Sequence, residues 1–104
     1  MAIPAGGFDW DEGNREKCTK HGVSLAQIEA AFREGLIVGP DVKHSQREER
    51  HWAIAKTDRE RWIFLVFTVR EREGRTLIRP IGARFMHAKE VKAYEKENPG
   101  LQER

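Results

Sequence analysis

The chain has 104 residues, of which 38% are hydrophobic and 35% are charged, and its mean hydropathy is -0.73. This length supports one domain with a modest core and is too short for two. No apolar run approaches the roughly 18 residues of a membrane span, and the N-terminal stretch MAIPAGGFDW lacks the basic and apolar regions of a signal peptide, so the sequence predicts a cytoplasmic protein.

Charge is distributed unevenly along the chain. The formal net charge is +2, yet residues 61–84 carry 6 basic and 2 acidic groups, whereas residues 1–41 carry 4 basic and 7 acidic groups. Binding responds to local fields more than to the total charge. The positive charge is therefore concentrated on the segment that is predicted below to form two strands.

The first predicted helix begins after Asp11, a suitable N-cap, and runs through Lys20 to a stop at Gly22. A helix this short is marginal by itself, and this one is mostly polar. We therefore expect Trp10 and Cys18 to hold it by packing onto another part of the chain.

The second predicted helix has the clearest local signal in the sequence. Ser24 and Gln27 form a capping box, and Val23 with Ile28 forms the hydrophobic staple that fixes the entry of the chain into the helix. The helix is predicted to end at Gly35.

Four segments are predicted to be extended: a short edge strand at 36–38, a hairpin formed by 50–57 and 62–69, and a last strand at 75–84. Both faces of the strand at 62–69 are apolar, which predicts a central strand covered on both sides. Pro80 cannot donate a ladder hydrogen bond, so it predicts a bulge or a free edge in the last strand.

Arg79 in the last strand falls on the same parity as Leu77, Ile81 and Ala83. An arginine on an apolar face must either extend to an edge of the sheet or be held there for a purpose. This position makes Arg79 a candidate functional residue.

A final helix is predicted over residues 88–96, with Val91 and Tyr94 buried. Together these elements predict an α+β fold in which an antiparallel sheet of three to four strands packs with two N-terminal helices and one C-terminal helix. The predicted organisation has three parts: a flexible N-terminus at 1–7, a single domain at 8–97 and a flexible tail at 98–104.

Several stretches give the sequence a resemblance to the BrnT family of bacterial type II toxins. The matching stretches are FDWD at 8–11 with Asn14, KHGVS at 20–24, HSQREER at 44–50, IRPIGAR at 78–84 and KEVKAYE at 89–95. They cover nearly the whole chain in the expected order. The sequence departs from the family pattern at Gly82, where a serine is usual, and at His87, where a threonine is usual.

The resemblance implies a RelE-like fold and an RNA-cleaving inhibitor of translation. It also implies a partner, a BrnA-like antitoxin with a ribbon-helix-helix part, in a complex with two copies of each chain. DNA would be bound only through that antitoxin. A non-catalytic RNA-binding or protein-binding module on the same scaffold is the alternative, motivated by Gly82 and His87.

RNA cleavage without a metal needs groups that take and give protons, and cations that stabilise the added negative charge. Arginine suits the second task because its planar fork pairs with two phosphate oxygens. Arg79 and Arg84 are the first candidates, and Arg70 follows. The alternative is that these arginines are solvated charges or partners of nearby glutamates.

Histidine is the usual proton-transfer group near neutral pH, and the chain has 4 histidines. His44 and Glu49 lie in a matched stretch and are the better candidates for proton transfer, although a plain loop is an equal alternative. His21 is as suited to capping a helix as to a functional role, and His51 and His87 are expected to be structural. The predicted RNA-binding residues are Lys20, His21, Arg50 and Arg70.

Cys18 and His21 have the spacing of half a zinc site, but no second pair follows at a suitable interval. The sequence therefore predicts no metal and no cofactor. Because it is the single cysteine, Cys18 also cannot form an internal disulfide. Trp10, Trp52 and Trp62 could stack on bases, although core packing is the commoner role, and Trp62 is expected in the core.

Overall fold

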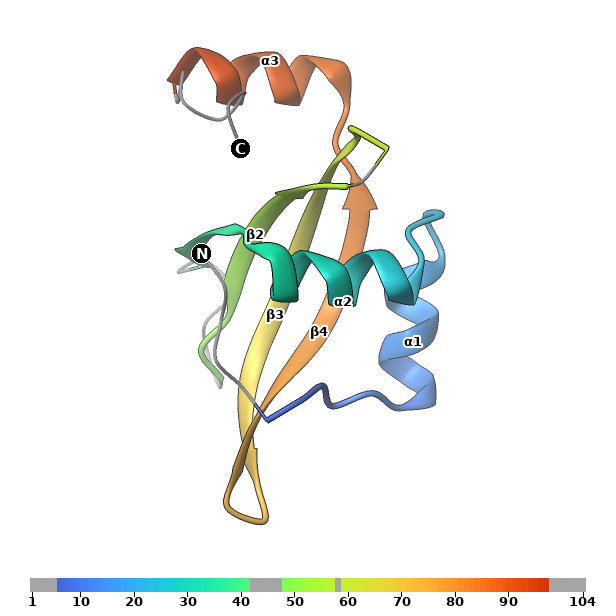
Figure 1. Ribbon diagram of the computed structural model, residues 1–104, viewed down its shortest axis with the longest axis vertical. Helices are drawn as coiled ribbons and strands as arrows, with labels where there is room; N and C mark the ends of the chain where they lie inside the picture. Colours follow the sequence, from blue (N-terminus) through green and yellow to red (C-terminus); the bar gives the residue numbers. More distant parts are fainter. Residues whose placement is uncertain (1–5, 42–47, 58, 98–104) are drawn as a thin grey trace.

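The computed structural model describes residues 6–41, 48–57 and 59–97, and the predicted tail at 98–104 and most of the predicted flexible N-terminus lie outside these residues. The elements are α1 (Glu12–Thr19), α2 (Leu25–Glu34), β1 (Ile37–Pro40), β2 (His51–Lys56), β3 (Trp62–Arg72), β4 (Arg75–Phe85) and α3 (Ala88–Glu97). The four strands form one antiparallel sheet in the order β1-β2-β3-β4 (Figure 1). The predicted α+β fold class is confirmed.

Local side-chain contacts fix where α1 and α2 begin. The Asn14 backbone N–H donates to the Asp11 carboxylate at 3.0 Å, and the Asn14 side chain accepts from the Asp11 N–H at 2.7 Å. Ser24 and Gln27 make the same reciprocal pair, each at 3.0 Å. Both predicted N-caps are confirmed. Gly35 ends α2 with a φ of 126°, a conformation that strains residues with a side chain.

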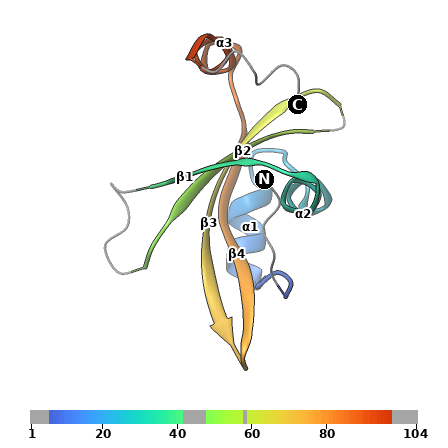
Figure 2. The ribbon, with the colours of Figure 1, turned by 60° about the vertical axis from the view of Figure 1, so that its left-hand side comes forward.

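The core lies between the sheet and the two N-terminal helices, which cover the same face of the sheet (Figure 2). Its central strand contributes Ile63, Leu65 and Phe67, each at most 1% exposed. Burial of this apolar surface is the main stabilising term of the fold. The core cluster comprises Cys18, Val23, Ile28, Ala31, Phe32, Leu36, Ala53, Ala55, Ile63, Leu65, Phe67, Ile78 and Ala83.

A register shift interrupts β4 next to the predicted bulge residue. Val66 pairs with Gly82, but the next residue of β3, Phe67, pairs with Pro80. Ile81 is therefore the extra residue of a β-bulge, as Pro80 predicted. The bulge also overturns the parity argument for Arg79: because alternation is reset at Ile81, Arg79 does not share a face with Ala83.

The face of the sheet opposite α1 and α2 has no helix lying over it in the part of the chain that the structure describes, and we call it the helix-free face. Trp62, Phe64 and Val66 of β3 lie on this face and are only half-buried. The prediction that this strand is covered on both sides is wrong, and Trp62 is not a core residue. The helices are short, and two of them suffice for one face only.

α3 lies beyond the end of the sheet instead of against either face (Figure 1). Val91 and Tyr94, which were predicted to be buried, are both half-exposed. The Tyr94 ring meets the Trp52 ring of β2 edge-on, with centroids 6.2 Å apart, so α3 touches the sheet without lying over either face. No helix within the described ranges is long and apolar enough to cross a membrane.

The residues before α1 extend the sheet at its β4 edge. Phe8 forms a parallel bridge with Ile78, and the Gly6 N–H donates to the Thr76 carbonyl at 2.7 Å. The Asp9 N–H donates to the Ile78 carbonyl at 2.8 Å. This segment, residues 6–9, therefore protects part of an edge that would otherwise present unpaired backbone groups.

Candidate functional site

Arg84 of β4 lies on the helix-free face, opposite Phe64 in the register. Its guanidinium lies 5.0 Å from the centroid of the Phe64 ring and donates to both carboxylate oxygens of Glu90 of α3, at 2.8 and 3.0 Å. The side chain is still 38% exposed. Arg84 thus combines a fixed position, an accessible charge and a single identified carboxylate partner.

The Arg84–Glu90 pair shifts the titration of both groups. The hydrogen bonds from Arg84 and then that from the His87 N–H lower the pKa of Glu90 to about 2. In return the Glu90 carboxylate raises the pKa of Arg84. Glu90 therefore stays ionised at neutral pH and links the end of β4 to the first turn of α3.

Beside Arg84 the helix-free face is hollowed by a cavity of about 380 Å³ that opens to solvent. A Cβ added at Gly82 would meet no atom within 4 Å, so the floor of the cavity is bare backbone at this position. Apolar walls with an arginine among them suit a flat, uncharged ring that has a negatively charged group attached to it. The lining residues are Asp41, Arg50, Trp52, Phe64, Val66, Ile81 and Gly82.

Trp52 is held in this cavity wall from two sides. A Cβ added at Gly39 on β1 would lie 2.2 Å from the Trp52 ring, so only glycine lets the indole lie this close to the strand. On its other side the ring meets Tyr94 of α3 edge-on, with centroids 6.2 Å apart. Trp52 therefore has a defined orientation on the helix-free face.

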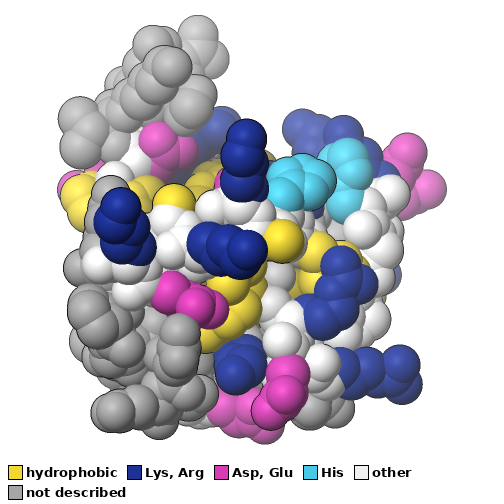
Figure 3. All heavy atoms as spheres, turned by 90° about the horizontal axis from the view of Figure 1, so that it is seen from above, with side chains coloured by type: hydrophobic (Ala, Val, Ile, Leu, Met, Phe, Trp, Pro, Cys, Tyr) yellow, Lys and Arg dark blue, Asp and Glu magenta, His cyan; other side chains and the backbone are white. Residues whose placement is uncertain are grey.

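The end of β4 gathers further cationic groups around Phe85. The Arg61 guanidinium lies 3.8 Å from the centroid of the Phe85 ring, and a Cβ at Gly22 would lie 3.7 Å from the same ring. Lys20 and His21, which precede Gly22, are both exposed, as is His87, two residues after Phe85. Figure 3 looks down on this end of the molecule, where Lys, Arg and His side chains surround apolar patches.

Arg79, by contrast, is held between two carboxylates in the middle of β4. Its guanidinium lies 2.8 Å from Asp11 and 3.7 Å from Asp9, and its side chain is 18% exposed. The pKa of Asp11 is lowered first by the hydrogen bond from the Asn14 N–H and then by that from Arg79. Arg79 thus ties α1 and the segment at 6–9 to β4.

A comparison with known protein families decides what this chain is. A family model described as the ribonuclease toxin BrnT of a type II toxin-antitoxin system matches residues 10–90. The chain belongs to the BrnT family. A search of curated proteins gave no match. The family is described as one of ribonuclease toxins, so the predicted resemblance is confirmed.

The other predicted site residues of this BrnT chain lie in β3 and just before β2. Arg70 of β3 donates to both carboxylate oxygens of Glu48, at 3.0 and 3.3 Å, and this contact raises the pKa of Arg70. Glu49 is exposed, Arg50 is half-buried in the cavity wall, and His44 lies outside the described residues. The predicted residues are therefore spread over three places: the C-terminal end of β4, the middle of β4 at Arg79, and the start of β2.

Cys18 of the BrnT chain is in the core, and burial raises the pKa of its thiol to about 11. A buried, protonated thiol is a poor nucleophile at neutral pH. Cys18 lies in the core whereas His21 is exposed, so the two side chains lie in different surroundings. Within the described ranges, no group of three or more His, Cys, Asp or Glu residues could hold a metal ion.

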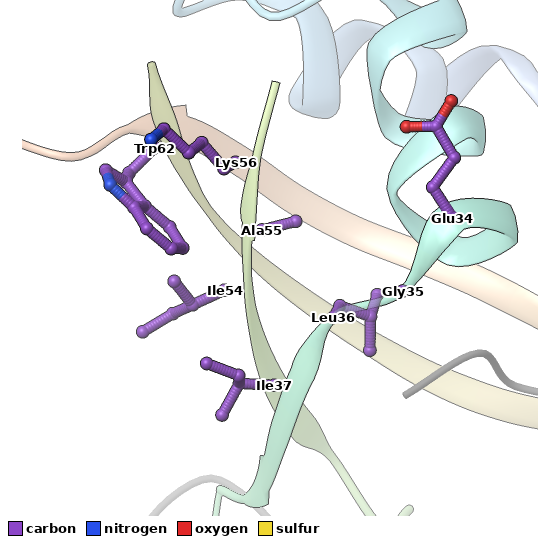
Figure 4. A pocket seen from close by; sticks show the side chains of 8 residues that line it. All are labelled: Glu34, Gly35, Leu36, Ile37, Ile54, Ala55, Lys56 and Trp62. Carbon is purple, nitrogen blue, oxygen red and sulfur yellow. The ribbon is translucent and has the colours of Figure 1, made fainter. Parts of the chain in front are cut away.

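A second hollow of about 370 Å³ opens where the end of α2 meets β1 and β2 (Figure 4). Leu36, Ile37 and Ile54 make it largely apolar, with Glu34 and Lys56 among its lining residues. It has no arginine or histidine in its lining. The cavity beside Arg84 therefore remains the better candidate for binding RNA in this BrnT chain.

Sequence reasoning missed three residues that the structure places around the candidate site: Arg61, His87 and Glu90. His87 and Glu90 have the spacing of the capping box, and the His87 N–H does donate to Glu90 at 2.9 Å. That signal was present in the sequence and could have placed Glu90 beside the end of β4. Arg61 had no such signal, because its position over Phe85 depends on the register of β3 and β4.

Proposed function

We propose that this BrnT chain is a metal-independent endoribonuclease that cuts single-stranded RNA and so inhibits translation in the cytoplasm. The observation that carries the proposal is Arg84, an accessible guanidinium fixed over Phe64 beside an open cavity. RNA would lie on the helix-free face with a phosphate at Arg84. This proposal assigns the ribonuclease activity of the family to one face of this chain.

A phosphate can compete for Arg84 because the pair with Glu90 is exposed. Exposed ion pairs are worth about 1 kcal/mol or less, and a backbone phosphate offers the same bidentate geometry with the same single negative charge. Glu90 would then hold the guanidinium in place until RNA arrives. Arg50, in the cavity wall, is proposed as a second contact to the RNA backbone.

The aromatic residues of the same face supply contacts to bases. Trp52 and Phe64 line the cavity, and Trp62 is half-exposed on the same strand as Phe64. Stacking of a base on an aromatic ring is worth about 1 to 3 kcal/mol and requires an unpaired base. Double-stranded RNA cannot make these contacts, so we expect single strands to be preferred.

The remaining predicted residues are assigned as follows. We propose that Arg79 holds the segment at 6–9 and α1 in place and does not contact RNA, since both of its partners are carboxylates of this chain. Lys20, His21 and Arg70 are proposed to contact RNA at the borders of the site. His44 and Glu49 stay predictions for proton transfer.

The test is incubation of the purified protein with a labelled single-stranded RNA of mixed sequence in the presence of a chelator. Cleavage is expected with the chelator present, and Arg84→Gln should reduce it. Arg72→Gln is the matched control, since Arg72 is an exposed arginine of β3 that pairs with Asp9. RNA that binds but stays intact would support the alternative, a non-catalytic binding module.

We further propose that a BrnA-like antitoxin with a ribbon-helix-helix part neutralises the toxin in a complex with two copies of each chain. The basic strands attract an acidic or amphipathic helix, because complementary charge speeds encounter while apolar contacts hold the complex. The mass of the mixture, measured by light scattering, should correspond to two copies of each. The association rate should fall as salt rises, and a rate independent of salt would place the antitoxin elsewhere.

A further inference from the structure

RNA cleavage requires two proton transfers, and the approach of Gly22 to Phe85 places two segments with exposed histidines side by side. His21 precedes Gly22, where a Cβ would lie 3.7 Å from the Phe85 ring, and His87 follows Phe85 by two residues. Both side chains are exposed. The sequence hides this neighbourhood, because His21 and His87 are 66 positions apart in the chain.

The neighbouring charges suit the two histidines to different tasks. The Glu90 carboxylate faces His87 from α3, and the positive charge of His87 is one of the causes that lower the pKa of Glu90. A carboxylate at this place attracts the charge of an imidazolium and can hold its ring. His21 instead follows Lys20, whose ammonium is also exposed.

Two arginines lie at the C-terminal end of β4, one on each face of the sheet. Arg84 reaches Glu90 from the helix-free face. Arg61 covers, at 3.8 Å, the ring of Phe85, which pairs with the buried Ile63 and so faces the helix-covered side. A phosphate bound at the strand end between them would gain two cations for the negative charge that develops during cleavage. The charged groups around this end are thus Glu90 from α3, Arg84 from β4, Arg61 just before β3, and Lys20 after α1.

We propose that His21 and His87 are the catalytic acid–base pair of this ribonuclease, with His21 as general base and His87 as general acid. The inference rests on the proposed function. His21 takes the proton of the 2'-hydroxyl, and the 2'-oxygen forms a bond to phosphorus. The bond from phosphorus to the 5'-oxygen breaks, and that oxygen takes a proton from His87. The products are a 2',3'-cyclic phosphate and a 5'-hydroxyl, and no metal, oxidant or reductant is needed.

The first experiment compares His21→Gln and His87→Gln with the wild type on the same single-stranded RNA. Each change should reduce the cleavage rate by about 100-fold or more, as removal of a general acid or base does. The pH profile of the wild type should be bell-shaped, and each variant should lose one limb of it. His51→Gln is the matched control, since His51 stacks on Phe67 at 5.2 Å, far along β3 from Phe85, and should cleave at the wild-type rate.

The second experiment separates the two roles with a substrate whose 5'-bridging oxygen is replaced by sulfur at the mapped cleavage position. The sulfur leaves without a proton, so this RNA should restore cleavage by His87→Gln but not by His21→Gln. Rescue of neither variant, or unchanged rates with the natural RNA, would overturn the acid–base pair while leaving the ribonuclease proposal intact. A wild-type protein that does not cleave any RNA would overturn both. Circular dichroism of each variant checks that the fold is retained.

Discussion

β4 carries one prominent arginine in its middle, Arg79, and one near its C-terminal end, Arg84, and the two have opposite surroundings. Arg79 lies between Asp9 and Asp11 with 18% of its side chain exposed, whereas Arg84 meets Glu90 on an open face with 38% exposed. The same residue type in the same strand therefore acts as a structural tie in the middle of the strand and as an available cation near its end. The two arginines differ in the residues packed around them, and the pattern of charges along the strand does not reveal this difference.

The difference follows from which elements reach each arginine. The segment at 6–9 and the N-terminus of α1 lie beside Arg79 and bring two carboxylates to it. Near Arg84 the chain leaves the sheet for α3, which stands beyond the strands and covers little of the face (Figure 1). The covered part of β4 serves stability, and the part that is left open is available for a ligand.

The largest expected effect is on cleavage by Arg84→Gln. Loss of a cation aimed at the transition state should slow cleavage by about 100-fold, or on the order of 3 kcal/mol in the barrier. The melting temperature should change little, because the pair with Glu90 is exposed. Rates measured by gel assay under single-turnover conditions test this, and a variant that cleaves at the wild-type rate would remove Arg84 from the site.

Arg79→Gln should show the opposite pattern. The change removes charge-assisted contacts to two carboxylates and should lower the free energy of unfolding by about 1 to 2 kcal/mol. The folded protein should still cleave RNA. Urea unfolding followed by tryptophan fluorescence gives the free energy, and a large loss of cleavage without loss of stability would show that Arg79 as well as Arg84 serves the chemistry.

A third change tests the helix-covered layer. Ser24→Ala removes the side chain that accepts from the Gln27 N–H at 3.0 Å, and should lower stability by about 1 kcal/mol with cleavage unchanged. Differential scanning calorimetry measures the change. An unaltered melting temperature would mean that this cap contributes nothing to the start of α2.

The smallest expected effect is the acid dependence of the Arg84–Glu90 pair. The pKa of Glu90 in the folded protein, about 2, is below its usual value of 4.5. A lowered pKa stabilises the fold above the usual value, and this contribution is lost as the pH falls from about 4.5 towards 2. The wild type should be more stable than Glu90→Gln at neutral pH by less than about 1 kcal/mol, since the pair is exposed.

The measurement is a series of melting temperatures for the wild type and Glu90→Gln between neutral pH and pH 2. The two curves should converge at the acid end. Parallel curves over the whole range would mean that the hydrogen bonds from Arg84 to Glu90 do not persist in solution.

Much of the fold could be predicted because its signals are local. The N-caps at Asp11 and Ser24 depend on residues three positions away, and Pro80 predicts a bulge because it has no N–H to donate. Which face of the sheet the helices would cover could not be predicted in this way. The two apolar faces of β3 look alike in the sequence, and only the placement of three helices leaves Trp62 and Phe64 half-exposed.

The candidate site was harder to predict because its residues meet through long-range contacts. Arg84 was identified from its motif, but its partner Glu90 and the proximity of Gly22 to Phe85 depend on how the chain returns after each strand. The alternation of side chains along β4 wrongly placed Arg79 on the same face as Ala83, because one extra residue at the bulge reverses the alternation. Arginine candidates in a strand are therefore best separated by their partners.

The most direct test of the account is to map where RNA binds without relying on its cleavage. An oligonucleotide with 2'-O-methyl groups lacks the nucleophile, so it can be titrated into the isotope-labelled protein and followed by nuclear magnetic resonance. The account predicts that signals of Arg84, His87, Gly82 and the Trp52 indole shift together, while those of Asp11 and Arg79 stay in place. Shifts confined to the residues around Arg79, with the helix-free face unchanged, would contradict the assignment of the RNA site to the helix-free face.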